Sequence, residues 1–274
     1  MLDAYLARIG LDAAPSPDAD GLAAIQRAHR LAIPFENLDI PIGRGISLDP
    51  AAIDAKIVGR RRGGYCFEQN QLFLRALREI GFDARALMAR VWLGAEETPP
   101  LTHTLNLVMI DDEPWIADAG FGGSYSPPMR LVADSERAAP DGTRHRLSRD
   151  ETYGWMLERR GDPAKTDGRG AGAPGWLRQY SFTLATVWPV DLAVGNHFTS
   201  TAPGTRFTTL KVVSRASSEG FVSLTDRHFT RRQTGSVAEH DVVDAAEYRA
   251  LLADVFGIAL DADEIVRLGL FPAG

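Results

Sequence analysis

The spacing of apolar residues predicts that the first third of the chain is helical. Apolar side chains recur there every three or four residues, which is typical of one buried helix face. Gly10 and Gly81 are expected to end the first and last of these helices, and Asp49-Pro50 supplies a cap and a first-turn proline for the third. The expected helices cover residues 2–9, 17–31, 51–58 and 69–80.

After residue 84 the pattern changes to short apolar runs between turn residues, which predicts β-strands. Residues 111–114, Asp-Asp-Glu-Pro, are a turn signal, and the Gly-, Pro- and charge-rich residues 161–175 are expected to form a long exposed loop. Helices, then strands, then a mixed end favour an α+β fold over the alternation of a parallel sheet. The expected strands are 84–93, 105–110, 115–117, 144–147, 153–158, 176–183, 205–214 and 220–224, followed by helices 244–256 and 262–268.

The composition of the chain limits the classes of protein to which it can belong. The 274 residues, 45% of them hydrophobic, are enough for a large core and two or three subdomains. A net charge of −6 argues against nucleic acid as a partner, and no apolar run is long enough to predict a membrane span. One cysteine cannot form an internal disulfide and the start lacks a signal-peptide pattern, so we expect a cytoplasmic protein.

That cysteine, Cys66, stands in the run Arg-Gly-Gly-Tyr-Cys-Phe-Glu, just before an expected helix. Its sulfur should lie at the first helical turn, where unpaired backbone N–H groups favour a thiolate. An ordinary thiol with a pKa near 8.5 is only about 3% ionised at neutral pH, so a nucleophile needs such help. The alternative is an inert cysteine that fills the core.

A thiolate nucleophile also needs a base and a group that orients the base. His103 begins an expected strand and Asp118 follows the next one. If the turn pairs Ile110 with Trp115, both side chains share a sheet face but stay about 13 Å apart along it. A direct hydrogen bond would need a reversal centred near Ile110 and Asp111. A backbone-bonded strand histidine and a turn-forming aspartate are the alternatives.

Together these segments resemble the arylamine N-acetyltransferase family. Residues 62–68 with Asn70 resemble its nucleophile motif, and the order and spacing of the motifs hold over nearly the whole chain. Ala117 and Ala119 stand where valines are common in relatives, which should alter packing more than chemistry. The other matching segments are Pro-Phe-Glu-Asn-Leu at 34–38, Thr-His-Thr-Leu-Asn-Leu at 102–107, Ala-Asp-Ala-Gly-Phe-Gly at 117–122, and Asn-His-Phe-Thr-Ser at 196–200 with Pro203 and Phe207.

The resemblance implies an architecture of the shorter, bacterial type. It implies a helical bundle over residues 1–84, a β-barrel over 85–192 and an α/β lid over 193–274, with a cysteine-protease-like catalytic core. The catalytic cleft is then expected between the bundle and the barrel.

The resemblance also implies the chemistry. Acetyl-CoA would be the donor and a small aromatic amine or hydrazine the acceptor, as in xenobiotic metabolism, with an acetyl-cysteine intermediate. No metal is implied, and no metal-ligand motif is present in the sequence. The resemblance implies that Cys66, His103 and Asp118 are catalytic and that Glu36, Arg62 and Asn70 support them. It implies CoA contacts for Thr102, Gly122, Phe198 and Gly204, and acceptor contacts for Phe35, Phe121 and Phe198.

Several signals support weaker interpretations. Glu36 and Arg62 are expected to form a structural ion pair, and Trp92 to be core rather than pocket. Arg60 or Arg61 could touch the CoA phosphates, although solvated charge is the favoured interpretation. Residues 170–175 match G-x-G-x-x-G, but no clear strand precedes them, so we interpret them as a loop.

Other functions stay open at this point. A cysteine hydrolase, a transglutaminase-like acyltransferase or an amide synthase could use the same triad. A protein that only binds CoA or an aromatic ligand is the non-enzymatic alternative.

Overall fold

Helices form the N-terminal part of the chain, as predicted. The computed structural model describes residues 1–139, 142–163, 166–167, 169, 175–217, 220–233 and 236–271. Gly10 and Gly81 end two helices in the left-handed conformation, and Asp18 and Asp49 cap two others by accepting hydrogen bonds from backbone N–H groups. The elements are α1 (Leu2–Ile9), α2 (Ala19–Ala32), α3 (Pro50–Ile53), a π-helix η1 (Asp54–Gly59) and α4 (Cys66–Ile80).

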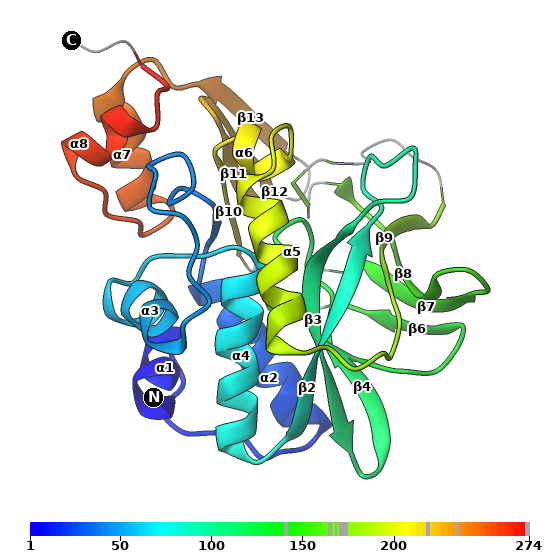
Figure 1. Ribbon diagram of the computed structural model, residues 1–274. Coiled ribbons are helices and arrows are strands. Elements are labelled where there is room, and N and C mark those ends of the chain that lie inside the picture. The colour runs from blue at the N-terminus through cyan, green and yellow to red at the C-terminus, as the bar shows by residue number, and fades with distance from the viewer. Residues whose placement is uncertain are drawn as a thin grey trace.

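An eight-stranded antiparallel sheet curls into a nearly closed barrel beside these helices (Figure 1). Its strand order is β5-β4-β3-β2-β9-β8-β7-β6, and Leu87, Leu105, Leu157 and Tyr180 are fully buried in its core. The strands are β2 (Asp83–Val91), β3 (Leu101–Ile110), β4 (Glu113–Ala117), β5 (Met129–Arg130), β6 (Ser135–Ala138), β7 (Arg144–Asp150), β8 (Gly154–Arg160) and β9 (Leu177–Phe182). The mixed helix-and-sheet class is therefore confirmed.

A second, five-stranded sheet contains the C-terminal strands and one short strand from the N-terminal region. That strand, β1 (Phe35–Glu36), pairs with β10, so that Phe35 lies opposite Ser214. Two helices, α7 (Ala245–Asp254) and α8 (Ala262–Arg267), pack against this sheet through a core that contains Tyr248. The other strands are β10 (Val212–Ala216), β11 (Gly220–Thr225), β12 (His228–Gln233) and β13 (Ser236–Asp241).

One long helix, α5 (Pro189–Thr201), runs beside α4 and β3 in the middle of the molecule (Figure 1). The short helix α6 (Arg206–Thr209) follows it. Gly195 allows the close approach of α5, because a Cβ there would lie 2.6 Å from Met88 Cε and 2.9 Å from Phe67 Cζ. The position of α5 therefore depends on a residue without a side chain.

Several predicted elements were wrong or absent. The strand predicted at 205–214 is instead α6 followed by β10, because the Thr208 and Thr209 hydroxyls bond the Thr205 carbonyl in a helical turn. Helix α5 was not predicted, because β-branched residues interrupt its apolar pattern. Strands β12 and β13 were also missed; β13 is exposed throughout and carries no apolar alternation.

The predicted hairpin register between β3 and β4 was also wrong. Ile110 pairs with Glu113, not with Trp115, because a two-residue turn connects the strands. Asp111 and Asp112 both have positive φ, 51° and 61°, the conformation that a tight hairpin turn requires. Asp118 therefore follows β4 two positions closer to His103 than the predicted register places it.

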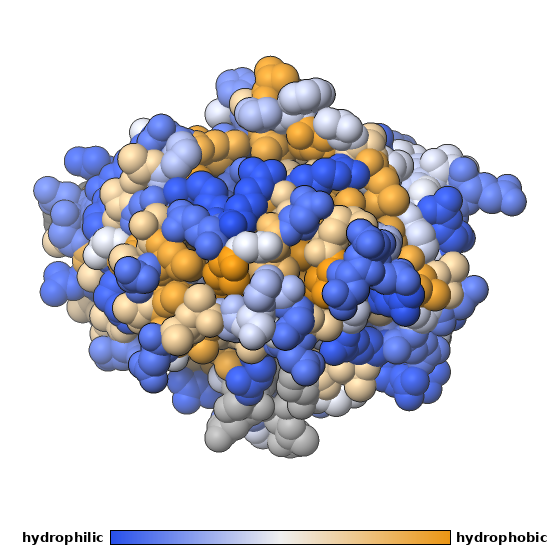
Figure 2. Space-filling view, turned by 90° about the horizontal axis from the view of Figure 1, so that it is seen from below, coloured by the Kyte–Doolittle hydropathy of each residue, from blue (hydrophilic) through white to orange (hydrophobic). Residues whose placement is uncertain are grey.

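The surface mixes hydrophilic and hydrophobic side chains, as the view from below shows (Figure 2). Within the described ranges, no helix is both long and apolar enough to cross a membrane. The predicted G-x-G-x-x-G loop lies, apart from Gly175, outside the described residues.

Substituting Gly195→Val should destabilise the protein by about 1–3 kcal/mol, because the added methyl groups would overlap Met88 and Phe67. Urea unfolding measures the change. Ala193→Val on the exposed side of the same helix is the matched control and should change stability by no more than about 0.7 kcal/mol. Equal effects of the two substitutions would show that α5 does not pack as described.

Candidate active site

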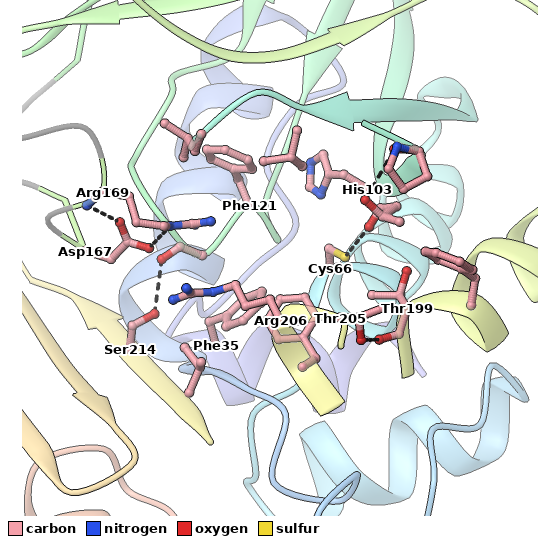
Figure 3. Close-up of a pocket in the computed structure, with 18 residues that line it drawn as sticks. Phe35, Cys66, His103, Phe121, Asp167, Arg169, Thr199, Thr205, Arg206 and Ser214 are labelled. Carbon is pink, nitrogen blue, oxygen red and sulfur yellow. Dashed lines mark hydrogen bonds and ion pairs between the residues drawn. The ribbon is translucent and has the colours of Figure 1, made fainter. Parts of the chain in front are cut away.

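A cavity of about 270 Å³ lies where α4, β3, the segment after β4, α5, α6 and β10 meet (Figure 3). Most of the residues expected at the site line it, namely Phe35, Cys66, Thr102, His103, Phe121, Gly122 and Phe198. Gly204 does not line it, although Thr205 does. Trp92 also does not; its indole donates to Ser181 Oγ, while Val91 and Leu93 face the cavity.

The Gly-Gly turn places Cys66 at the first position of α4. Gly63 has no room for a side chain, because a Cβ would lie 2.2 Å from the Pro34 carbonyl oxygen. Glu68 closes the helix start by accepting a hydrogen bond from the Tyr65 N–H at 3.1 Å. The sulfur is 3.7 Å from the Thr102 carbonyl oxygen, and the residue is 3% exposed.

Burial raises the pKa of the Cys66 thiol well above its usual range, and the charge of Asp118 adds to the effect. The N–H groups of Phe67 and Thr104 act in the opposite direction but are outweighed. The sequence-based expectation that the helix start favours a thiolate is thus too simple. Ionisation of this sulfur requires a positively charged neighbour.

The imidazole of His103 lies above the sulfur at the same cavity wall (Figure 3). His103 Nε2 bonds Asp118 Oδ2 at 2.7 Å, and the rings of Phe121 and Tyr180 pack against the imidazole with centroids 5.2 and 5.1 Å away. Nδ1 is therefore the ring nitrogen that is left for proton exchange with Cys66. The direct contact that the predicted register did not provide is present.

Asp118 is buried, and both of its carboxylate oxygens are hydrogen-bonded. Its Oδ1 accepts hydrogen bonds from Asn70 Nδ2 and from the Gly120 N–H, both at 3.0 Å. Burial acts against ionisation, but the charge and hydrogen bond of His103 and the amide of Asn70 hold the pKa of Asp118 below its usual value. Gln26, from α2, accepts from the Asp118 N–H at 2.8 Å. Sequence reasoning missed Gln26, whose only signal is a polar residue on a buried helix face.

A cluster of buried charges packs against the segment that carries Cys66. Arg62 bonds Glu36 at 2.9 Å, the ion pair that the sequence predicts. Lys56, which the sequence analysis did not identify, bonds Glu68 at 2.8 Å and Asp39 at 3.0 Å. Three carboxylates thus face two cations with little access to water, and burial raises the pKa of Glu68 to about 7.

The far end of the cavity carries charged residues that the sequence analysis did not identify. Arg169 bonds Asp167 at 2.6 Å, and the guanidinium of Arg206 faces the same end (Figure 3). Ser214 Oγ donates to the Gly122 carbonyl at 3.1 Å. In the part of the chain that the structure describes, no group of three or more histidine, cysteine or acidic side chains is arranged to hold a metal ion.

Known proteins resemble this chain in both sequence and fold. An N-acetyltransferase family model matches residues 18–265. The chain is 36% identical to arylamine N-acetyltransferase of Escherichia coli K12 over 95% of its length and 90% of the relative. It is 37% identical, with the same coverage, to the Salmonella typhimurium arylamine N-acetyltransferase / N-hydroxyarylamine O-acetyltransferase.

Solved structures agree with these matches. The Salmonella typhimurium arylamine N-acetyltransferase superposes with a TM-score of 0.88 at 35% identity over 98% of both chains. The Mycobacterium marinum enzyme in complex with CoA gives 0.85 at 31% identity, also over 98% of both chains. The fold is that of an N-acetyltransferase. The chain belongs to the arylamine N-acetyltransferase family and is an acyltransferase.

The buried charge cluster should make stability depend on pH through Glu68. Its pKa in the folded state, about 7, lies above the usual value of 4.5, so between these pH values the folded state holds a proton that the unfolded chain has lost. The free energy of unfolding should therefore fall as the pH rises from about 4.5 to 7. In Glu68→Gln this decline should be smaller.

Urea unfolding of both proteins at pH 5 and pH 7 measures the difference. Glu97→Gln, at an exposed position, is the control and should keep the slope of the unsubstituted protein. Identical slopes in all three proteins would contradict a raised Glu68 pKa.

Proposed function

We propose that this chain transfers the acetyl group of acetyl-CoA to the amino group of an arylamine or arylhydrazine through an acetyl-cysteine intermediate. The observation that carries the proposal is that Cys66 and His103 lie at the wall of one cavity, with His103 bonded at 2.7 Å to the buried Asp118. Family membership and the CoA complex of the Mycobacterium marinum relative support the donor.

The first step activates the sulfur. His103 takes the thiol proton of Cys66, and Asp118 holds the imidazole by Nε2 and stabilises its positive charge. The helix start contributes about 0.3–1 kcal/mol to a thiolate, so the imidazolium must supply most of the stabilisation that burial removes. The thiolate attacks the thioester carbonyl carbon, the bond from that carbon to the CoA sulfur breaks, and CoA leaves with the proton.

The second step returns the enzyme to its starting state. The acceptor amine attacks the acetyl-cysteine carbonyl, His103 removes the amine proton, and the Cys66 sulfur leaves and is protonated again. Backbone N–H groups at the start of α4 would stabilise the oxyanion in both steps. Thioester exchange is nearly balanced in free energy, whereas amide formation drives the cycle forward.

The cavity supplies the binding surfaces. Phe35, Phe121 and Phe198 would pack against the aromatic ring of the acceptor. Thr102 and Gly122, which also line the cavity, and Gly204 near its edge would contact CoA. Glu36, Arg62 and Asn70 would hold the nucleophile and the aspartate in place rather than touch substrate.

Several further expectations belong to the same proposal. The catalytic core would be of the cysteine-protease type, the regions 1–84, 85–192 and 193–274 would act as bundle, barrel and lid, and the enzyme would be cytoplasmic and act on xenobiotic amines. A hydrolase with the same triad is the rival. It would release CoA from acetyl-CoA without an amine as fast as with one.

Mixing the protein with acetyl-CoA should add one acetyl group, on Cys66, because the thioester intermediate is comparable in energy to the donor. Intact and peptide mass spectrometry detect it. Cys66→Ser should abolish transfer while circular dichroism shows an unchanged fold. Substantial residual transfer, or an acetyl group on another residue, would rule out the covalent mechanism.

Replacing His103, the proposed base, should make the Cys66 sulfur react more slowly with an alkylating reagent. In His103→Gln the thiol keeps the raised pKa that burial gives it, so at pH 7 it should react with iodoacetamide at least about 30-fold more slowly than the unsubstituted protein. The rate of the variant should rise about tenfold per pH unit, while that of the unsubstituted protein should vary little near neutrality. Equal rates at pH 7 would show that His103 does not ionise Cys66.

A further inference from the structure

Three buried polar side chains form a hydrogen-bonded row behind the segment that carries Cys66, and the acyl-transfer steps do not use them. They are Tyr5 of α1, His29 of α2 and Gln69 of α4. Tyr5 Oη lies 2.8 Å from His29 Nδ1, and His29 Nε2 lies 3.1 Å from Gln69 Oε1. Tyr5 and His29 are 0% exposed and Gln69 is 2% exposed, so these groups must satisfy one another.

The last member of the row determines the direction of every hydrogen bond in it. Gln69 Nε2 lies 2.6 Å from the Gly64 carbonyl oxygen and 3.2 Å from that of Pro34, and a carbonyl oxygen can only accept. The amide nitrogen therefore faces the two carbonyls, and the amide oxygen faces His29. Because that oxygen also only accepts, His29 Nε2 must carry a proton. Nδ1 must then accept from the Tyr5 hydroxyl.

The surroundings of His29 maintain this neutral form of the imidazole. Burial lowers the pKa of His29 to about 3. The charges of Arg30 and Arg8 act in the same direction, and together these effects outweigh the hydrogen bond of Gln69 and the charge of Asp118. Near neutral pH the ring is therefore uncharged and carries its one proton on the nitrogen that faces Gln69.

The two carbonyls that Gln69 binds belong to the backbone that leads to Cys66. Gly64 stands two residues before the cysteine, and its N–H donates to the Pro34 carbonyl at 3.4 Å. Gly64 also forms a parallel bridge with Phe35. Gln69 thus fastens the glycine turn to the neighbouring segment from the inside of the protein.

We propose that His29 is a positioning residue for Cys66, acting through Gln69 on the glycine turn that precedes the sulfur. The inference rests on the proposed acetyl transfer and adds a residue that serves it from outside the cavity. Without the N–H of His29, the Gln69 oxygen would be buried without a donor, which is costly. The side chain could avoid this state only by giving up its hydrogen bonds to the two carbonyls, and the turn would then hold the sulfur less firmly beside His103.

The test measures the rate at which acetyl-CoA acetylates Cys66 in a single turnover, by rapid quenching and mass spectrometry. In His29→Leu the maximal rate should fall about 10- to 100-fold, because a misplaced nucleophile loses its attack geometry. The acetyl-CoA concentration that gives half of the maximal rate should not change. His29→Gln, whose amide N–H can reach Gln69, should restore part of the rate.

Leu22→Ala is the matched control for a loss of stability. Leu22 is fully buried in the same helix, about two turns before His29, and is not part of the row. Its truncation should destabilise the protein towards urea but leave the acetylation rate unchanged. An unchanged rate in His29→Leu, or an equal fall in Leu22→Ala, would overturn the inference. A change in the half-saturating concentration alone would also overturn it.

Alkylation of Cys66 by iodoacetamide separates a failure of this inference from a failure of the proposed function, because it needs no acetyl donor. If the unsubstituted protein forms no acetyl-enzyme, the proposed function fails. His29→Leu should still react about 10-fold more slowly at pH 7 than Leu22→Ala does. Equal alkylation rates would contradict positioning by His29.

A measurement on the unsubstituted protein covers the case in which His29→Leu does not fold. Nitrogen-15 NMR should show His29 as a neutral imidazole protonated on Nε2, with no change between pH 5 and pH 8, because its pKa of about 3 lies below this range. A His29 ring protonated on Nδ1, or one that titrates near the ordinary value of about 6.5, would overturn the inference.

Discussion

The site depends on one buried carboxylate whose oxygens must all be satisfied without water. Asp118 accepts from His103, Asn70 and the Gly120 N–H, and its own N–H donates to Gln26. These partners come from β3, α4, the segment after β4 and α2, so a single anion ties the barrel to the helical region. An unpaired carboxylate in this position would cost several kcal/mol, which fixes the four segments relative to one another. The hydrogen bond between Asp118 and His103 therefore also fixes the orientation of the His103 imidazole.

The buried charge cluster holds the segment around Cys66 in place, as Asp118 holds His103. Lys56 and Arg62 neutralise carboxylates that bracket the Gly-Gly turn, and Glu68 links the cluster to the first turn of α4. Such a cluster gains little net stability over apolar packing, but an error in its geometry leaves a bare charge. The arrangement therefore holds the sulfur in one place. Burial, and not the helix start, dominates the pKa of its thiol.

The sequence allowed prediction of the parts that depend on local pattern. The helix that carries Cys66 followed from apolar spacing and the Gly-Gly break, and the motifs named Cys66, His103 and Asp118 as the candidate triad. The hairpin register did not follow, because the left-handed conformation of Asp111 and Asp112 shortens the turn and the letters Asp-Asp-Glu-Pro do not encode this. Gln26 and Lys56 act only through contacts between distant segments. Arg206 lay in a threonine-rich stretch that resembles a strand until its hydroxyls are placed.

The pairing of β1 with β10 links Phe35 to Ser214, residues far apart in the chain that both line the cavity. During synthesis the N-terminal segment must wait until most of the chain has left the ribosome before this pair can form. The pocket is thus a late, high-contact-order product of folding, assembled after the helices that contain Cys66. A nascent or truncated chain would display Cys66 without the walls that give the thiol its selectivity.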